Sequence, residues 1–236
     1  MKKRSGFTLA ELLLAVMIFG FMATSLATIY STANRHMFQN YRANIIKSNV
    51  GIAMRAVQNT LSMSTRIDAP AFNSSGNTLS FATNVDQLTG CYPVAPGVEA
   101  RWHHFCIGPD PNPKMAGLNS LFYHTGTIGG GTGCAAAAPT LWVPSYPAPA
   151  ACGSSGGTIT LLMQAAVPNP VFFSRRNLEV KMVNGVAKNV VGVTEHDQVL
   201  IMLRSFWSAS NRGFGKAQRD IDFGLESNVR VNIYAP

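Results

Sequence analysis

The stretch Gly6-Phe7-Thr8-Leu9-Ala10-Glu11-Leu12-Leu13 places a single carboxylate at the entrance of a long apolar segment. A basic leader, Met1-Lys2-Lys3-Arg4-Ser5, precedes it, and the 23 residues from Leu12 to Asn34 carry no charge. A helix that rises about 1.5 Å per residue would extend this segment over about 34 Å, enough to cross a hydrocarbon core of about 30 Å. The sequence therefore predicts a membrane-spanning helix with Glu11 as its unusual residue.

The carboxylate of Glu11 needs a partner at that depth. A charge inside a bilayer costs at least about 2.5–3.5 kcal/mol, and such residues normally pair with another polar group. If the chain is cut between Gly6 and Phe7, the new α-amine of Phe7 lies close to the membrane depth of Glu11. An ammonium and a carboxylate attract strongly in a low dielectric, although both must be desolvated. The pair could form within one chain or between neighbouring subunits.

The run Lys2-Lys3-Arg4-Ser5-Gly6, followed by Phe7-Thr8-Leu9-Ala10-Glu11, resembles the class III signal of type IV prepilins and type II secretion pseudopilins. In that family a membrane peptidase cuts after the glycine and methylates the new amine, and the glutamate registers each subunit against its neighbour. The resemblance covers about residues 1–60. It implies cleavage between Gly6 and Phe7, N-methylation of Phe7 and an assembly role for Glu11.

The resemblance also implies a function and a location. Thr28 stands where many major pilins have a proline, which favours a minor pilin that helps initiate or decorate a type IV pilus. A minor pseudopilin of a type II secretion system and a DNA-uptake pilin are the alternatives, and Glu11 argues against the tipmost secretion subunit. The implied partners are the prepilin peptidase/methyltransferase, other pilin or pseudopilin subunits and inner-membrane lipid, with DNA as an unsupported possibility.

Two other interpretations of the N-terminus stay open. Thr8-x-x-Glu11 also matches a helix capping box, and a glutamate in the first turn complements the helix dipole in any case. A conventional secretory signal, cleaved near Ser25-Leu26-Ala27, is the second alternative. We favour the class III signal because the basic leader, the glutamate and the apolar run coincide.

The composition fits an anchored extracytoplasmic protein. Only 13% of residues are charged, against about 25% in typical soluble domains. The chain has 19 basic and 11 acidic side chains, a net charge of +8, and removal of Lys2, Lys3 and Arg4 leaves 16 against 11, or +5. Lysine and arginine at the N-terminus predict that this end is cytoplasmic and the rest periplasmic, in a single pass through the bacterial inner membrane before transfer to a filament or the cell surface.

Four cysteines, Cys91, Cys106, Cys134 and Cys152, suit an oxidising compartment. Three pairings are possible, and we expect the nearest-neighbour pairing, Cys91–Cys106 and Cys134–Cys152. Zinc binding by His103, His104, Cys106 and Cys91 is the alternative, but their spacing fits none of the usual zinc patterns. We therefore expect disulfides, no metal and no cofactor.

The hydrophobic pattern predicts an α+β fold. Apolar residues at helical spacing continue the first helix as an amphipathic segment to about Arg66, and Asp68-Ala69-Pro70 should end it. This long helix, membrane-embedded in its first half, should pack on an antiparallel sheet. We expect a leader at 1–6, a transmembrane or filament-core half at 7–34 and a pilin-like head at 35–236, with a disulfide-pinned, loop-rich insertion at about 86–157. Strands are predicted at 77–83, 99–107, 120–125, 158–163, 178–183, 186–193, 198–207 and 229–234.

The remaining candidate groups predict no catalytic chemistry. His196 and Asp197 are adjacent on a predicted strand and should point to opposite faces, and Asp220 with Asp222 is too small a group for a calcium loop. A set of aromatic residues forms either a binding surface or packing under loops, and a set of basic residues forms either a DNA-contacting stripe or a solvated helix face. We favour packing and the solvated face. The sets are Trp102, Phe122, Tyr123, Trp142 and Tyr146, and Arg35, Arg42, Lys47, Arg55 and Arg66.

Overall fold

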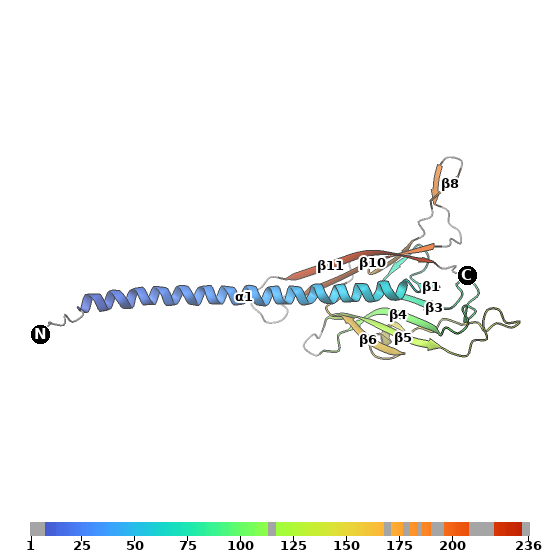
Figure 1. Ribbon diagram of the computed structural model, residues 1–236, viewed down its shortest axis with the longest axis horizontal. Coiled ribbons are helices and arrows are strands. Elements are labelled where there is room, and N and C mark those ends of the chain that lie inside the picture. Colours follow the sequence, from blue (N-terminus) through green and yellow to red (C-terminus); the bar gives the residue numbers. More distant parts are fainter. Residues whose placement is uncertain are drawn as a thin grey trace. The chain divides into compact units, whose positions relative to one another are not determined.

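The computed structural model describes residues 8–112, 117–167, 171–176, 180–183, 186–189, 196–207 and 220–232. Contacts group the described residues into two compact units. The first is the helix α1 (Leu9–Leu61) as far as Ile45, and the second begins at Ile46 and contains all the described strands (Figure 1). The predicted α+β class is confirmed.

In the first unit, the helix is continuous because its sequence offers no breaker. It contains no proline, and its hydroxyl side chains bond to carbonyls one turn back. Thr24 Oγ1 donates to Gly20 O at 3.0 Å, Thr28 Oγ1 to Thr24 O at 2.8 Å and Thr32 Oγ1 to Thr28 O at 2.8 Å. Each of these bonds satisfies a hydroxyl donor that would otherwise be costly to bury in an apolar environment. Among the described residues, α1 is the one helix long and apolar enough to cross a membrane.

The helix ends at Leu61, earlier than the sequence predicted. Ser64 donates to the Leu61 carbonyl through both its backbone N–H and its hydroxyl, which closes the last turn. The segment that was expected to stop the helix is instead the strand β1 (Arg66–Ala69), and it pairs antiparallel with β3 (Leu79–Thr83). The seryl and threonyl residues after Leu61, rather than Pro70, therefore set the end of the helix.

The larger sheet has five antiparallel strands in the order β1-β3-β4-β5-β6. Its central strands are β4 (Ala100–Pro109) and β5 (Asn119–Ile128), and β6 (Thr158–Met163) is an edge. The strands predicted at 99–107 and 120–125 within the loop-rich region are confirmed as β4 and β5, but each is ten residues long and together they form the middle of this sheet. Histidine, threonine and glycine within these strands weakened the apolar alternation. The intervening turns and the short helix η2 (Pro149–Ala151) carry the Gly- and Pro-rich sequence.

The smaller sheet has the order β11-β10-β7-β2. Its strands are β2 (Ser75–Gly76), β7 (Phe173–Arg176), β10 (His196–Trp207) and β11 (Ile221–Asn232). The last strand begins earlier than the predicted residue 229, since β11 begins at Ile221 and pairs with β10 throughout. Gly224 interrupts the alternation and hid the start of the strand. The hairpin β8 (Val180–Val183) and β9 (Val186–Asn189) is confirmed, with its Asn184-Gly185 turn outside the described residues.

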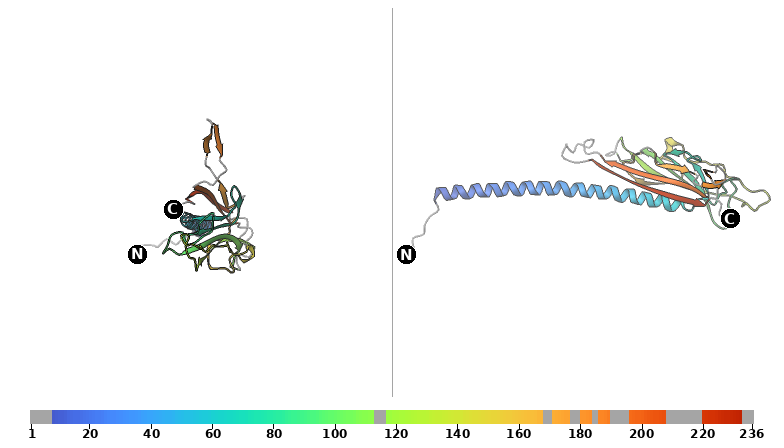
Figure 2. Two further views of the ribbon diagram at one scale, coloured as in Figure 1. Left: turned by 90° about the vertical axis from the view of Figure 1, so that its right-hand side faces the viewer. Right: turned by 90° about the horizontal axis from the view of Figure 1, so that it is seen from above.

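The second unit has one main core between its two sheets. The last four turns of α1 run between them, so that both sheets cover the helix (Figure 2). This part of the helix reads as amphipathic in the sequence because its apolar side chains recur every three or four residues. The buried helix residues are Val50, Ala53, Met54, Val57 and Leu61.

Candidate functional site

Glu11 lies in the first turn of α1 and forms a complete capping box with Thr8. The Thr8 backbone N–H donates to Glu11 Oε2 at 2.9 Å, the Thr8 hydroxyl donates to the same oxygen at 3.0 Å, and the Glu11 N–H donates to Thr8 Oγ1 at 3.3 Å. Two orphan amides at the helix start are thereby satisfied. Capping is therefore one role of this pair, and Gly6 and Phe7 lie outside the described residues.

The capping geometry leaves part of the carboxylate available. All hydrogen bonds that Glu11 accepts within the described residues go to Oε2, and the residue is exposed. Its other oxygen, Oε1, can therefore receive a further donor without breaking the cap. A capping role and a counter-charge role are compatible in this arrangement.

The helix after Glu11 is apolar on every side. Residues 9–33 are all exposed, including Leu14 at 62% and Phe21 at 72%. Such a surface is far larger than the scattered apolar side chains of a soluble protein. It requires burial in lipid, in neighbouring proteins, or in both.

The basic residues expected to form a solvated face of the helix do not all lie on the helix. Arg66 lies in β1, where its Nε is 2.8 Å from Asp68 Oδ1 and its guanidinium lies over the Trp142 ring. Lys47 lies over the Phe223 ring, with its Nζ 5.9 Å from the ring centroid. Arg35 and Arg55 are exposed on α1. Arg66 and Lys47 therefore contribute to packing in the second unit.

All four cysteines form disulfides, but the expected pairing is wrong. Cys91 bonds to Cys134, and Cys106 bonds to Cys152. Cys106 lies well inside β4, on its face away from α1, so the segment carrying Cys152 reaches it by crossing that face. Cys91 lies beyond the other end of β4, opposite Leu141, where two loops meet. The spacing of the cysteines in the sequence could not show this pairing. The first six residues of β4, Ala100 to Phe105, lie between Cys91 and Cys106 and keep these two cysteines apart in space.

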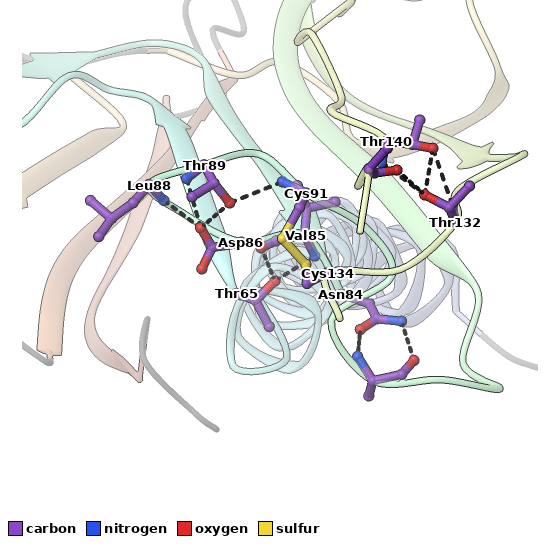
Figure 3. The surroundings of a disulfide bond; sticks show 12 residues. Thr65, Asn84, Val85, Asp86, Leu88, Thr89, Cys91, Thr132, Cys134 and Thr140 are labelled. Atoms are coloured by element: carbon purple, nitrogen blue, oxygen red, sulfur yellow. Dashed lines mark hydrogen bonds between the residues drawn. A yellow bond between two sulfur atoms is a disulfide. The ribbon is translucent and has the colours of Figure 1, made fainter. Parts of the chain in front are cut away.

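The Cys91–Cys134 bridge secures the loops at the Ala100 end of β4 (Figure 3). Asp86 Oδ1 accepts hydrogen bonds from the backbone N–H groups of Leu88 and Thr89, at 3.1 and 2.7 Å. These bonds to the carboxylate hold the pKa of Asp86 below its usual value, against the opposing effect of its partial burial. The loop before Cys91 is therefore a turn in which the Asp86 carboxylate binds the backbone N–H groups of Leu88 and Thr89.

The segment 141–157, here called the strap, covers the face of the larger sheet that points away from α1. Its Tyr146 hydroxyl donates to Asp68 Oδ2 at 2.7 Å, and its ring stacks on His104 with centroids 5.7 Å apart. Burial, followed by the nearby Asp68 charge, raises the pKa of Tyr146. Glycine permits the close fit of the strap, since a Cβ at Gly153 would lie 2.7 Å from the Phe122 ring of β5.

The aromatic residues singled out in the sequence take part in this packing. Phe122 is buried, and Trp102, Tyr123, Trp142 and Tyr146 are half-buried. Trp102 and Trp142 both meet the Tyr146 ring edge to face. The predicted packing under loops is confirmed. The Asp68–Tyr146 bond joins residues 78 positions apart, and no local pattern pointed to it.

The zinc site that was considered as an alternative, with His103, His104, Cys106 and Cys91 as ligands, does not match the observed arrangement. Within the described residues, the one group of three histidine, cysteine or acidic side chains with clustered ligand atoms is Cys106, His124 and Cys152, all within 4.8 Å. The two sulfurs are bonded to each other. Both ring nitrogens of His124 are engaged: Gly153 N–H donates to Nε2 at 2.9 Å, and Nδ1 lies 2.8 Å from Gly156 O. The arrangement therefore secures the strap.

His103 and His104 lie on opposite faces of β4 and are both buried. His103 Nδ1 is 2.6 Å from the Tyr123 hydroxyl, and His104 Nδ1 is 2.7 Å from Ser80 Oγ. The Nε2 atom of each has no hydrogen-bond partner in the part of the chain that the structure describes. Burial lowers the pKa of both to about 4, with smaller contributions from Arg101 at His103 and from His124 at His104. Both rings are therefore neutral near pH 7.

Comparison with known proteins identifies the N-terminal segment. Residues 1–27 match the prokaryotic N-terminal methylation motif. This class III signal is characteristic of type IV pilins and pseudopilins, so the resemblance inferred from the leader and Glu11 is confirmed. No match was found among curated proteins or solved structures.

The motif and the apolar helix support a membrane-anchored protein of the pilin or pseudopilin kind. Processing by a prepilin peptidase and assembly with other pilin subunits are what the motif implies. This kind of protein is structural and not usually enzymatic.

Proposed function

We propose that the chain is a minor pilin-like structural subunit of a type IV pilus, which a prepilin peptidase processes and which helps initiate or decorate the filament. The observation that carries this proposal is the methylation motif at residues 1–27, with Glu11 at the start of a helix that is apolar on all sides. The motif supports transfer of the subunit from the membrane into an assembly. The exposed apolar surface of the helix supports its burial against lipid and neighbouring helices.

We propose a different location for each part of the chain. Residues 1–6 are the leader, residues 7–34 are the transmembrane or filament-core half of the helix, and residues 35–236 are the periplasmic head. Cleavage falls between Gly6 and Phe7, and Phe7 receives the N-methyl group. The N-terminus begins in the cytoplasm, and the processed subunit later occupies the filament or the cell surface.

Thr28 supports a minor rather than a major subunit. Many major pilins have a proline there, which helps their helix to open within a filament, whereas Thr28 donates to the Thr24 carbonyl within an unbroken helix. A structural role also suits the second unit, because His103, His104 and Tyr146 are used there in packing.

The deciding experiment is intact-mass measurement and N-terminal sequencing of the protein from its native membrane. We expect a mature chain that begins with N-methylated Phe7. A chain that begins near Thr28 would show conventional secretion, and an uncut Met1 would show a plain membrane anchor; either result would overturn the proposal. Gly6→Leu should block leader removal, because the peptidase site requires a small residue there.

The counter-charge role of Glu11 has its own test. Glu11→Gln keeps a side-chain acceptor for the Thr8 cap and removes the charge. We expect membrane insertion to continue and incorporation into filaments to fall. The matched control is Glu226→Gln, which removes an exposed carboxylate from β11 and should leave incorporation unchanged. Normal incorporation of Glu11→Gln would contradict the pairing of Glu11 with a neighbouring amine.

A further inference from the structure

The edge strand β6 carries no charge or proline to protect its open edge, although its register with β5 shifts between Leu121 and Phe122. It pairs with β5 on one side and is the last strand of the larger sheet among the described residues. Its sequence, Thr158-Ile159-Thr160-Leu161-Leu162-Met163, contains no charge and no proline. Thr158, Thr160 and Leu161 are exposed. An edge of this kind presents unpaired backbone N–H and C=O groups to any extended chain that approaches it.

The other edges of the five-stranded and four-stranded sheets in the described part of the chain are protected. β1 carries the paired Arg66 and Asp68 and is followed by Pro70. β11 presents exposed charges at Asp222, Glu226 and Arg230, and β2 has only two residues. Charges, prolines and short length are the usual means by which sheets avoid edge-to-edge pairing. The contrast marks β6 as the edge that is open to another strand.

The sequence around β6 is also without charge. From Met115 to Ser174 there is no aspartate, glutamate, lysine or arginine, a run of 60 residues that includes β5, the strap and β6. A charged segment laid along this edge would lose solvation, and these 60 residues would offer it no opposite charge. The surface therefore favours a neutral partner.

We infer that β6 accepts an added β-strand from a neighbouring pilin-like subunit, which extends the larger sheet across the contact between two subunits. This inference rests on the proposed function, since it names a partner for the assembled protein. The incoming strand would run beside Ile159 and Leu161 on one face and beside Thr158 and Thr160 on the other. Its chemistry is therefore neutral, with apolar residues alternating with small hydroxyl residues.

A second copy of this chain is the competing occupant. Two identical β6 edges would pair antiparallel about a twofold axis and form a closed dimer. A closed pair uses up the edge and cannot continue a filament, in which each contact joins different surfaces of successive subunits. A different subunit that supplies the strand avoids this limit.

Photo-crosslinking in the native membrane tests the inference on the full-length chain. p-Benzoylphenylalanine replaces Thr160 in one sample and Glu226, an exposed residue on the protected strand β11, in the other. Mass spectrometry then identifies each adduct. We expect Thr160 to give an adduct with a different protein that carries the N-terminal methylation motif. An adduct only with a second copy, no adduct, or equal yields at both positions would overturn the inference.

A charge placed on the edge gives the second measurement. Thr160→Lys, combined with the crosslinker at Thr158, should lower the adduct yield about tenfold, because the lysine would be desolvated beside the incoming strand. Thr160→Ser, with the same crosslinker, is the matched control and should keep the yield. Thermal unfolding and the mass of the non-reduced chain establish that both variants fold with both disulfides intact. An unchanged yield with Thr160→Lys would contradict strand addition.

The same samples separate failure of this inference from failure of the proposed function. N-methylated Phe7 and recovery of the chain with sheared filaments report the proposed function. If the chain is processed and assembled but Thr160 gives no subunit adduct, only strand addition at β6 is wrong. If the chain is neither processed nor assembled, the proposed function itself is wrong, and the inference that rests on it is withdrawn.

Discussion

One helix passes through two different environments. From Leu9 to Ala33 every residue of α1 is exposed, whereas Val50, Ala53, Val57 and Leu61 are completely buried within the second unit. Both parts are rich in apolar side chains, yet within the described residues only the second is buried by other parts of the chain. The first part is therefore stabilised by contact with lipid or with neighbouring subunits. The second part is stabilised by the sheets, the disulfides and the strap. Mutations should separate these two sources of stability.

The largest effect on the second unit should come from removing a disulfide. Cys106→Ala with Cys152→Ala opens a loop with a sequence separation of 46 residues. The chain-entropy model assigns such a loop roughly 4 kcal/mol of unfolding free energy. We expect this loss in urea unfolding of the detergent-solubilised chain, while the exposed part of α1 stays helical by circular dichroism.

The other disulfide is a matched control for packing. Cys91→Ala with Cys134→Ala opens a loop of 43 residues, so the entropic loss should be nearly the same. Cys106 and Cys152 are buried with Phe122, however, and hold the strap on the sheet. We therefore expect the Cys106–Cys152 pair to be the more costly of the two. Equal losses would show that this packing adds nothing to stability.

A pair of leucine substitutions on the same helix tests the comparison directly. Leu61 is fully buried, so Leu61→Ala should lower the unfolding free energy by about 2–5 kcal/mol. Leu14 is 62% exposed, so Leu14→Ala should change it by less than about 0.5 kcal/mol in detergent. A large loss from Leu14→Ala would mean that the first part of the helix is stabilised within its own chain.

Sequence reasoning succeeded where one strong signal acts locally. The leader, Glu11 and the uncharged run identified the class III signal without any three-dimensional information. Asn184-Gly185 located the β8–β9 hairpin, and the alternation at Thr158–Met163 gave β6 with the right ends. In each case the chemistry that determines the structure lies within a few consecutive residues.

The failures involve long-range pairing. β1 and β7 are four-residue strands, too short to show a period, and β7 pairs with β2, where Ser75 and Ser174 are 99 residues apart in the sequence. The pairing of Cys106 with Cys152 depends on the path of the strap across β4. The number of residues between cysteines in the sequence does not show that path. The capping box was weighed only as an alternative to the assembly role of Glu11, whereas the geometry makes the two compatible.

The buried histidines predict acid sensitivity in the second unit alone. An unfolded histidine takes up a proton below about pH 6.5, whereas the pKa of His103 and of His104 in the folded chain is about 4. Their contribution to stability is therefore complete above about pH 6.5 and is lost as the pH falls toward 4. Each should remove about 2 kcal/mol between pH 7 and 5, at about 1.4 kcal/mol per pH unit below 6.5.

Urea unfolding across that pH range checks the sign. His104→Gln should flatten the dependence of the unfolding free energy on pH by about half. His36→Gln, on the exposed part of α1, should leave the dependence unchanged. Stability that rises on acidification would contradict the assignment of these two histidines as buried and neutral.

The smallest effect should come from the start of the helix. Thr8→Ala removes the hydroxyl that accepts from the Glu11 N–H and donates to its carboxylate, which costs about 1 kcal/mol of local helix stability. Because residues 9–33 make no buried contacts in the isolated chain, this loss should fray the first turn without affecting the head. Amide hydrogen exchange in micelles should therefore accelerate within the first turn and stay constant around Val57. Thr8→Ser keeps a capping hydroxyl and should exchange like the native chain, so equal acceleration in both variants would show that the hydroxyl does not stabilise the helix start.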